Sequence, residues 1–421
     1  MAHQAHNLPW NTLADNFKFV YANARYKNCT NLYPRFKPGQ GSQLQHFARV
    51  FARVLDSSSS QERQKFPNAE DADQDEPDEL FISPAAASRI ARTVKWDNEQ
   101  TLAEEKRRLS YWVMEITDPT YPHADKSQRE MVEMLKTLLL YGDMEPLLRF
   151  ARQPLVNMEC IWDYPEEDCL SEMIEKFLTT YICLNVLVLK PELWDPTSRS
   201  ESLDSFRKYA TPRSRDKAVP ENWDYRLTKG YQLMLVKAVT AQWNHDERVA
   251  TYPHREFFGV TKDVYSSGLR WQRAKFGLGP ISDLVDKRCR NLRLPHKSDI
   301  PIVINLLGRK GLPAELALDV LELAEYGGTM RRLPVADDPL HLENREELRK
   351  YLGYCWRVLT RLDMLIKEND KWIDWEFEVT GAIHQLWGVV YPKMSEVVDA
   401  TMCEDRRPGE VDMYRRLRTF I

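Results

Sequence analysis

His245-Asp246-Glu247, with His254 nearby, is the densest group of titratable side chains in the sequence. An imidazole titrates near neutral pH, so this group could hold a general base. The same residues also fit the polar end of a helix, where the helix dipole favours a charged histidine. We therefore retain, as an alternative function, an enzyme whose site is built from dispersed residues, and we assign no catalytic residue.

The common contiguous motifs for nucleotides and metal ions are missing from the sequence. The Gly-Leu-Gly at 277–279 lacks the third glycine of a dinucleotide-binding turn, and no glycine-rich loop ends in Gly-Lys-Ser/Thr. Asp71, Asp73 and Asp75 are spaced like the first ligands of a calcium loop. The glycine that such a loop requires is replaced by Glu76, and no two cysteines have the spacing of zinc ligands. The sequence therefore predicts no cofactor and no metal site.

A locally basic stretch spans residues 270–297, with Trp271 and Phe276 among its cations. Basic and aromatic side chains together can bind phosphate backbones and stack on bases. The stretch could equally be a solvated face that pairs with the protein's own acids, or a nuclear-import signal. A nucleic-acid-associated protein is thus a second alternative. The formal net charge of -4 is small for 421 residues, which argues against a chain built wholly around nucleic acid.

Length, cysteine usage and hydropathy place the protein in a broad class. A chain of 421 residues with 43% hydrophobic side chains can bury more than one core, so we expect two or three domains. Its seven cysteines are scattered and odd in number, which is typical of reduced thiols in the cytoplasm or nucleus. The N-terminus lacks the basic and apolar regions of a secretory signal. The most apolar segment, Tyr181–Leu189, is too short to span a membrane, so we expect a soluble intracellular protein without membrane association.

Apolar residues recur mostly at helical spacing, and strand signals are few. The sequence therefore predicts an all-α fold, an irregular multi-helix bundle. We divide it into an N-terminal segment at 1–56 with a short helix at 43–55, a linker at 57–80, a helical domain at 81–298 and a helical C-terminal region at 299–421. The linker begins with four serines and continues with acidic residues. It has too few apolar side chains to offset the entropy of ordering, so we expect it to be disordered.

The helical pattern is clearest near the C-terminus. A seam of apolar side chains steps by three and four residues through Leu348, Leu352, Cys355, Leu359, Leu362 and Ile366. A polar break at 368–370 separates this helix from a second predicted helix at 375–398. A short connection of this kind favours an antiparallel helical hairpin.

Residues 311–326 form the segment most suggestive of a partner-binding site. Pro313 stands near the start of a predicted helix, and Gly327 follows its end. One stripe of that helix carries four apolar residues, Leu312, Leu316, Val320 and Leu323. Such a stripe fits either a core helix or a surface that binds another protein.

The pattern Leu312-Pro313-x-Glu315-Leu316, followed by Val320-Leu321, resembles the opening of an F-box. In that family the Leu-Pro pair and the apolar positions after it contact the small adaptor subunit of cullin-based ubiquitin ligases. The resemblance implies adaptor contacts at five residues of this chain, Leu312, Pro313, Leu316, Val320 and Leu321. The stretch at 338–348 with the Cys-Trp pair at 355–356 is similar to proteins of filamentous fungi that carry an F-box-like helix in a helical C-terminal region. We therefore expect a protein-interaction or adaptor protein, linked to a ubiquitin ligase.

Overall fold

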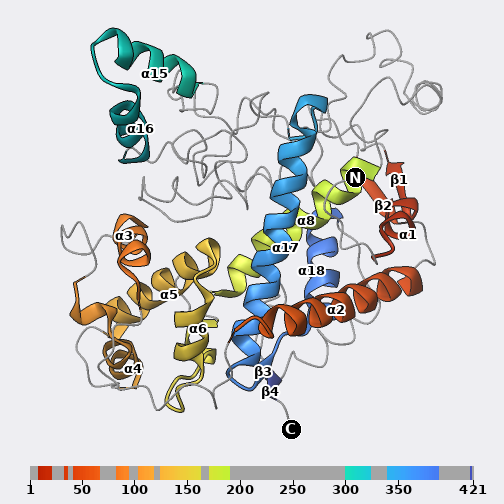
Figure 1. Cartoon of the computed structure of the whole chain (residues 1–421). Coiled ribbons are helices and arrows are strands. Elements are labelled where there is room, and N and C mark those ends of the chain that lie inside the picture. The colour runs from red at the N-terminus through yellow and green to blue at the C-terminus, as the bar shows by residue number, and fades with distance from the viewer. Residues whose placement is uncertain are drawn as a thin grey trace.

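The computed structural model describes residues 8–20, 33–36, 41–66, 82–93, 103–117, 124–162, 170–189, 299–323, 339–387 and 418–419. Helices make up most of these residues (Figure 1). Two short antiparallel strand pairs accompany them in the described ranges: β1 (Phe17–Val20) with β2 (Tyr33–Phe36), and β3 (Lys371–Trp372) with β4 (Arg418–Thr419). The predicted all-α fold is therefore confirmed.

The helices follow one another along the chain with these bounds: α1 (Trp10–Asp15), α2 (Gly41–Arg63), α3 (Pro84–Thr93), η1 (Glu105–Arg107), α4 (Leu109–Thr117), α5 (Ala124–Tyr141), α6 (Met144–Ala151), α7 (Glu159–Trp162), α8 (Leu170–Leu189), α15 (Asp299–Arg309), α16 (Ala314–Leu323), η8 (Leu342–Asn344), α17 (Arg345–Lys367) and α18 (Trp375–Trp387).

Helices α8 and α17 form the centre of the described fold. α17 packs against α2, α8, α6 and α5, while α8 also packs against α18 and α1. Figure 1 shows α17, in blue, crossing the middle of the view with α8 beside it. α8 carries apolar residues on all sides and is buried along most of its length, as expected of a central helix.

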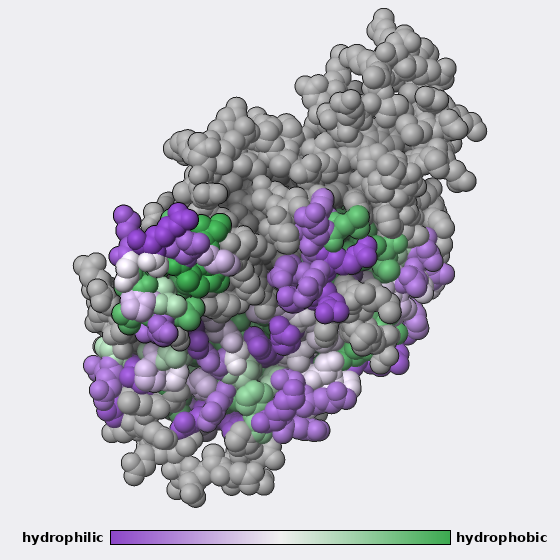
Figure 2. All heavy atoms as spheres, turned by 45° about the horizontal axis from the view of Figure 1, so that its top comes forward, coloured by the Kyte–Doolittle hydropathy of each residue, from purple (hydrophilic) through white to green (hydrophobic). Residues whose placement is uncertain are grey.

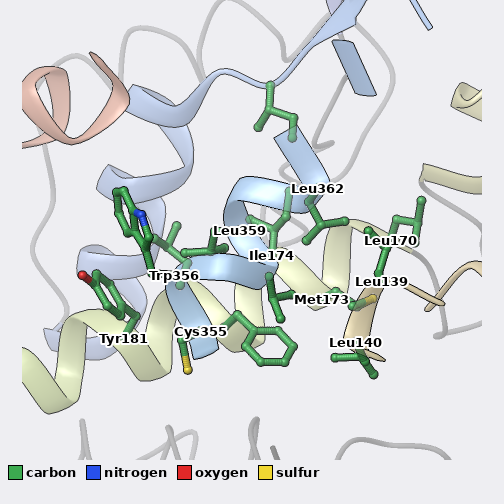
Figure 3. Close-up of a cluster of buried hydrophobic side chains, with 14 of the residues drawn as sticks. Leu139, Leu140, Leu170, Met173, Ile174, Tyr181, Cys355, Trp356, Leu359 and Leu362 are labelled. Carbon is green, nitrogen blue, oxygen red and sulfur yellow. The ribbon is translucent and has the colours of Figure 1, made fainter. Parts of the chain in front are cut away.

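The apolar seam predicted for α17 faces this core. All six of its members are at most 4% exposed. Figure 3 shows Leu359 and Leu362 of α17 beside Ile174 of α8, with Cys355 lying nearer to Tyr181. α18 packs mainly against α2 and α8. α17 and α18 therefore bury their apolar faces against the same two neighbours, α2 and α8.

An aromatic cluster joins the N-terminal helices to this centre. The ring of Tyr181 on α8 lies 5.6 Å from Trp10 on α1 and 5.6 Å from Trp356 on α17. Phe51 on α2 contacts Trp356 at 5.4 Å, and Phe47 contacts Trp10 at 5.1 Å. The rings meet edge-on or tilted, which is the arrangement that aromatic quadrupoles favour. Four helices far apart in the sequence are thus held by one set of contacts.

The C-terminal end of α5 is also held by α17. Gly142 follows α5 with φ +84°, a left-handed conformation that favours glycine. Its N–H donates to the Leu138 carbonyl at 2.8 Å, as in a helix-ending turn. Arg361 of α17 donates from Nη1 to the Leu139 carbonyl at 2.9 Å, and the Tyr354 hydroxyl donates to the Leu140 carbonyl at 3.0 Å. Carbonyls that the helix itself leaves unpaired are thereby satisfied.

The predicted start of the disordered linker at residue 57 is wrong. α2 continues through the four serines to Arg63. Ser58 donates to the Val54 carbonyl at 2.8 Å, and the Ser59 hydroxyl donates to the carboxylate of Asp363. These contacts satisfy hydroxyls that would otherwise favour a turn. Residues 67–80 of the predicted linker lie outside the described ranges.

Candidate partner-binding site

The segment that resembles an F-box forms a pair of short helices, α15 and α16, that pack on one another. Gly311 lies between them with φ +86°. Its N–H donates to the Gly308 carbonyl at 2.9 Å, and the Leu312 N–H donates to the Leu307 carbonyl at 3.1 Å. These two bonds form a glycine-ended helix cap, which reverses the chain so that Pro313 leads directly into α16. A side chain at Gly311 would meet no atom within 4 Å, so its backbone conformation is what favours glycine there.

The apolar stripe of α16 faces solvent. Leu316, Val320 and Leu323 stand at i, i+4 and i+7, and they are 49%, 45% and 85% exposed. The buried side chains of α16 are Ala317 and Leu321, which lie on another side of the helix. The side of α16 that carries Ala317 and Leu321 is therefore buried. The larger apolar side chains Leu316, Val320 and Leu323 remain exposed and available for contact.

The five residues predicted to contact the adaptor are not equally accessible: some are exposed and others are partly or fully buried. Pro313, Leu316 and Val320 are exposed, and Leu312 is half-buried. Leu321 is buried, which withdraws its side chain from the surface. The structure thus exposes Leu316 and Val320 on α16 and Pro313 just before it, and it buries Leu321.

Helix α15 adds exposed residues that the F-box resemblance does not include. Ile302 and Leu306 are 59% and 55% exposed, and Leu318 on α16 is 53% exposed. Over the described ranges, every large hydrophobic side chain that is exposed lies on α15 or α16, apart from Leu155 and Leu342. Figure 2 shows green atoms gathered at the left, the side on which Figure 1 places α15 and α16. The nearly uninterrupted apolar run at 300–307 was the sequence signal for these residues, because a helix that is apolar all round needs cover on more than one side.

Charged residues surround the apolar positions of the helix pair. Arg309 and Lys310 are exposed at the end of α15, and Glu315 and Asp319 are exposed one turn apart on α16. An apolar centre with a charged border is the usual composition of a protein-binding surface. Apolar and charged side chains are therefore both exposed on this helix pair.

A buried ionic cluster lies elsewhere, where α2, α17 and α18 meet. The Asp363 carboxylate is buried and accepts hydrogen bonds from Trp375 Nε1 at 2.7 Å and from the Ser59 hydroxyl. Lys367 Nζ lies 2.6 Å from Asp363 Oδ2 and 3.2 Å from Ser59 Oγ. A serine beside a lysine suggests a nucleophile and its base.

The electrostatics of this cluster favour a structural role. Burial alone would lower the pKa of Lys367, but the charges and hydrogen bonds of Asp363 and Asp56 outweigh it and raise that pKa. Lys367 is therefore held as an ammonium, which has no lone pair with which to accept the Ser59 proton. Ser59 is also buried, so its hydroxyl is not an accessible nucleophile. The cluster instead ties α2, α17 and α18 together.

A second ionic tie follows directly on α17. Glu368 accepts from Arg63 Nε of α2 at 2.7 Å and from Arg152, which follows α6. Burial would raise the pKa of Glu368, but the hydrogen bonds from Arg63 and Arg152 outweigh burial and lower that pKa. Asn369 donates to the Ala151 and Val156 carbonyls at 2.9 Å each. The end of α17 is thus fixed to both α2 and the α6 end.

The other segments considered in the sequence, including the acidic spacing rejected as a calcium loop, lie outside the described residues. These are the His245 group with His254, the basic stretch at 270–297 and the acidic spacing at 71–76. In the part of the chain that the structure describes, no group of three or more His, Cys, Asp or Glu side chains could hold a metal ion. Within the same part, no helix combines the length and apolar character needed to cross a bilayer.

Comparison with known proteins gives a family for the chain. Residues 11–396 match the family model described as gramillins biosynthetic cluster protein GRA5. No curated protein and no solved structure matches the chain. The expected likeness to fungal proteins is confirmed, while the matched family is not the F-box family. Because the match covers most of its length, the chain belongs to the family of the gramillins biosynthetic cluster protein GRA5, a fungal biosynthetic cluster protein family.

Proposed function

We propose that this protein is an interaction or adaptor protein that binds its partner through α16. The observation that carries the proposal is the exposed stripe of Leu316, Val320 and Leu323. Apolar anchors at i, i+4 and i+7 are the way in which one helix is recognised by the groove of another protein. The stripe is exposed although α16 buries Ala317 and Leu321 and packs on α15.

The resemblance to an F-box supplies the partner: the small adaptor subunit of a cullin-based ubiquitin ligase. Pro313 and Leu316 occupy positions at the start of α16 that the F-box pattern assigns to this contact. Both are exposed, as is Val320 one turn further along. The protein would then link the ligase to another molecule held elsewhere on its surface.

The strength of the contact depends on a few side chains. Burying a fully exposed leucine or valine is worth about 1.5–3 kcal/mol, and Leu316 and Val320 are about half exposed. Few residues usually dominate the binding energy of such a surface. Placing a charge at Leu316 should therefore remove most of the binding, because the carboxylate would have to be buried without a counter-ion.

Capture of the purified full-length chain by the adaptor subunit tests the proposal. Wild-type protein should be recovered, and Leu316→Asp and Leu312→Asp should each lower recovery at least tenfold. Leu342→Asp is the matched control, since it introduces the same charge at a leucine that is 69% exposed and lies outside the helix pair. If wild-type protein recovers no adaptor, or if the control loses as much as Leu316→Asp, the proposal is wrong.

A further inference from the structure

The charged side chains that the structure describes on α16 are both acidic, and they lie beside the exposed apolar stripe. Glu315 directly precedes Leu316 in the helix. Asp319 directly precedes Val320, so the two carboxylates form a row parallel to the apolar one. Asp319 also stands three positions after Leu316 and four before Leu323, spacings that make side chains neighbours on a helix surface. A surface that covers the stripe therefore also approaches the two carboxylates.

Both carboxylates of this acidic row are exposed, and neither has a cationic partner among the described residues. Like charges four positions apart repel each other along a helix, so the pair does not stabilise α16. Glu315 stands in the first turn, where the helix dipole favours an acid. Asp319 lies beyond that turn, and aspartate is a poor residue for the interior of a helix. The stability of α16 therefore does not account for the whole row.

The exposed cations of the helix pair precede the turn between its two helices. Arg309 ends α15, and Lys310 follows it directly. Within the ranges that the structure describes, neither forms an ion pair with the acidic row. The charge of Glu315 and Asp319 therefore remains available to a binding partner.

We propose that the partner protein receives α16 in an apolar groove that is bordered by lysine or arginine side chains. This inference rests on the proposed function, because it takes the stripe as the contact with the partner. A basic border would pair with Glu315 and Asp319 while the groove covers Leu316 and Val320. An acidic border would repel both carboxylates, so the charges decide which grooves are accepted. The same carboxylates would repel the phosphate groups of a nucleic acid or of an anionic membrane.

Two synthetic helical peptides, added to the full-length chain, provide the test. Both peptides carry one row of leucines, which is bordered by lysines in one peptide and by glutamates in the other. Fluorescence anisotropy of the labelled peptides measures their dissociation constants. The wild-type chain should bind the lysine-bordered peptide about tenfold more tightly, because two exposed ion pairs each contribute modestly. This preference should shrink as NaCl is raised, since salt screens exposed charges.

Charge reversal on α16 tests the acidic row directly. Glu315→Lys combined with Asp319→Lys should reverse the preference, so that the glutamate-bordered peptide binds more tightly. The matched control combines Glu343→Lys with Glu346→Lys, which changes the same amount of charge at two exposed acids outside the helix pair. This control should keep the wild-type preference. A general attraction between an acidic protein and a basic peptide would instead change equally in both double variants.

Two further measurements identify the contact. Leu316→Asp should weaken the binding of both peptides, because both use the apolar stripe. Hydrogen exchange over residues 299–323 should be the same in wild type and in the variant with Glu315→Lys and Asp319→Lys. Unchanged protection shows that the helix pair is folded, so that a reversed preference comes from the charges alone.

Capture by the ubiquitin-ligase adaptor separates this inference from the proposed function. A chain that prefers the lysine-bordered peptide but recovers no adaptor contradicts the proposed partner alone. A chain that recovers the adaptor but binds both peptides equally contradicts the basic border alone. The inference is also overturned if neither peptide binds, or if the control double variant loses the preference as fully as the variant of the acidic row.

Discussion

The hydroxyl of Ser59 on α2 donates a hydrogen bond to the carboxylate of Asp363 on α17, which lies 304 positions later in the chain. The same carboxylate accepts from Trp375 and pairs with Lys367. A buried carboxylate is stable only when its partners replace the water it has lost. One residue therefore joins α2, α17 and α18.

Replacing Asp363 should destabilise the fold more than any surface change. Asp363→Ala leaves the Trp375 N–H and the Lys367 ammonium without this acceptor, and we expect a loss of about 3–5 kcal/mol in the free energy of unfolding. Asp363→Asn keeps an acceptor for Trp375 and should lose less. Urea unfolding followed by circular dichroism measures both.

The control for this change is Glu346→Ala, which breaks an exposed pair with Lys350 of 3.1 Å. It should change stability by less than about 1 kcal/mol, because exposed ion pairs are screened by water. Equal losses for Asp363→Ala and Glu346→Ala would mean that the buried network does not hold the helices together.

Two glycines with similar backbone conformations should respond differently to alanine. Gly142 and Gly311 have φ of +84° and +86°. A Cβ at Gly142 would lie 2.4 Å from Nη2 of Arg361, whereas a Cβ at Gly311 would meet nothing within 4 Å. Gly311→Ala should therefore cost only the backbone strain, about 1–2 kcal/mol, and Gly142→Ala should cost more.

A double-mutant cycle identifies the source of the difference. If the clash with Arg361 is real, Gly142→Ala should cost less in an Arg361→Ala background than in wild type. Unfolding free energies of the four proteins give this comparison. A Gly142→Ala effect that is the same in both backgrounds would assign the whole loss to the backbone.

Acid should weaken the tie at the end of α17. Arg63 and Arg152 lower the pKa of Glu368 below its ordinary value of 4.5, so the folded state holds the charged carboxylate better than the unfolded state does. The resulting stability is present above pH 4.5 and is lost as the pH falls through the lower folded-state pKa. Glu368→Gln should flatten the decline of stability over this acidic range and leave its slope near neutral pH unchanged.

This prediction is measured by urea unfolding of wild type and Glu368→Gln at several pH values from neutral to acidic. Both proteins carry every other carboxylate, so the difference between the two curves reports on Glu368 alone. Parallel curves throughout the acidic range would show that the two arginines do not favour the charged form.

Substitutions at two leucines of α16 should distinguish packing of this helix from binding of the partner. Leu321 is 6% exposed and Leu316 is 49% exposed. Leu321→Asp should unpack α16 from α15, and Leu316→Asp should leave the helix pair folded. Hydrogen exchange over residues 299–323 measures this: protection of the backbone should fall in the first variant only. Equal loss of protection in both would assign the α16 stripe to the core.

The sequence by itself determined the helical character and the core face of α17. Leu352, Cys355 and Leu359 could be assigned to the core because apolar residues at helical spacing have to share one buried side. Pro313 and the following leucines likewise predicted a helix, and α16 forms there. Local periodicity is sufficient for such predictions because it depends only on residues a few positions apart.

Only the tertiary structure decided what each helix faces. Four serines in a polar stretch predicted disorder, yet Ser59 lies in α2 because Asp363, distant in sequence, provides its hydrogen-bond partner. Leu316 and Leu321 have the same chemistry and lie in the same short helix, but only Leu321 is buried. The spacing of residues predicts which of them share one side of a helix. Whether that side is exposed depends on which other segments pack on it. Those contacts join residues that are far apart in the sequence, so no local pattern predicts them.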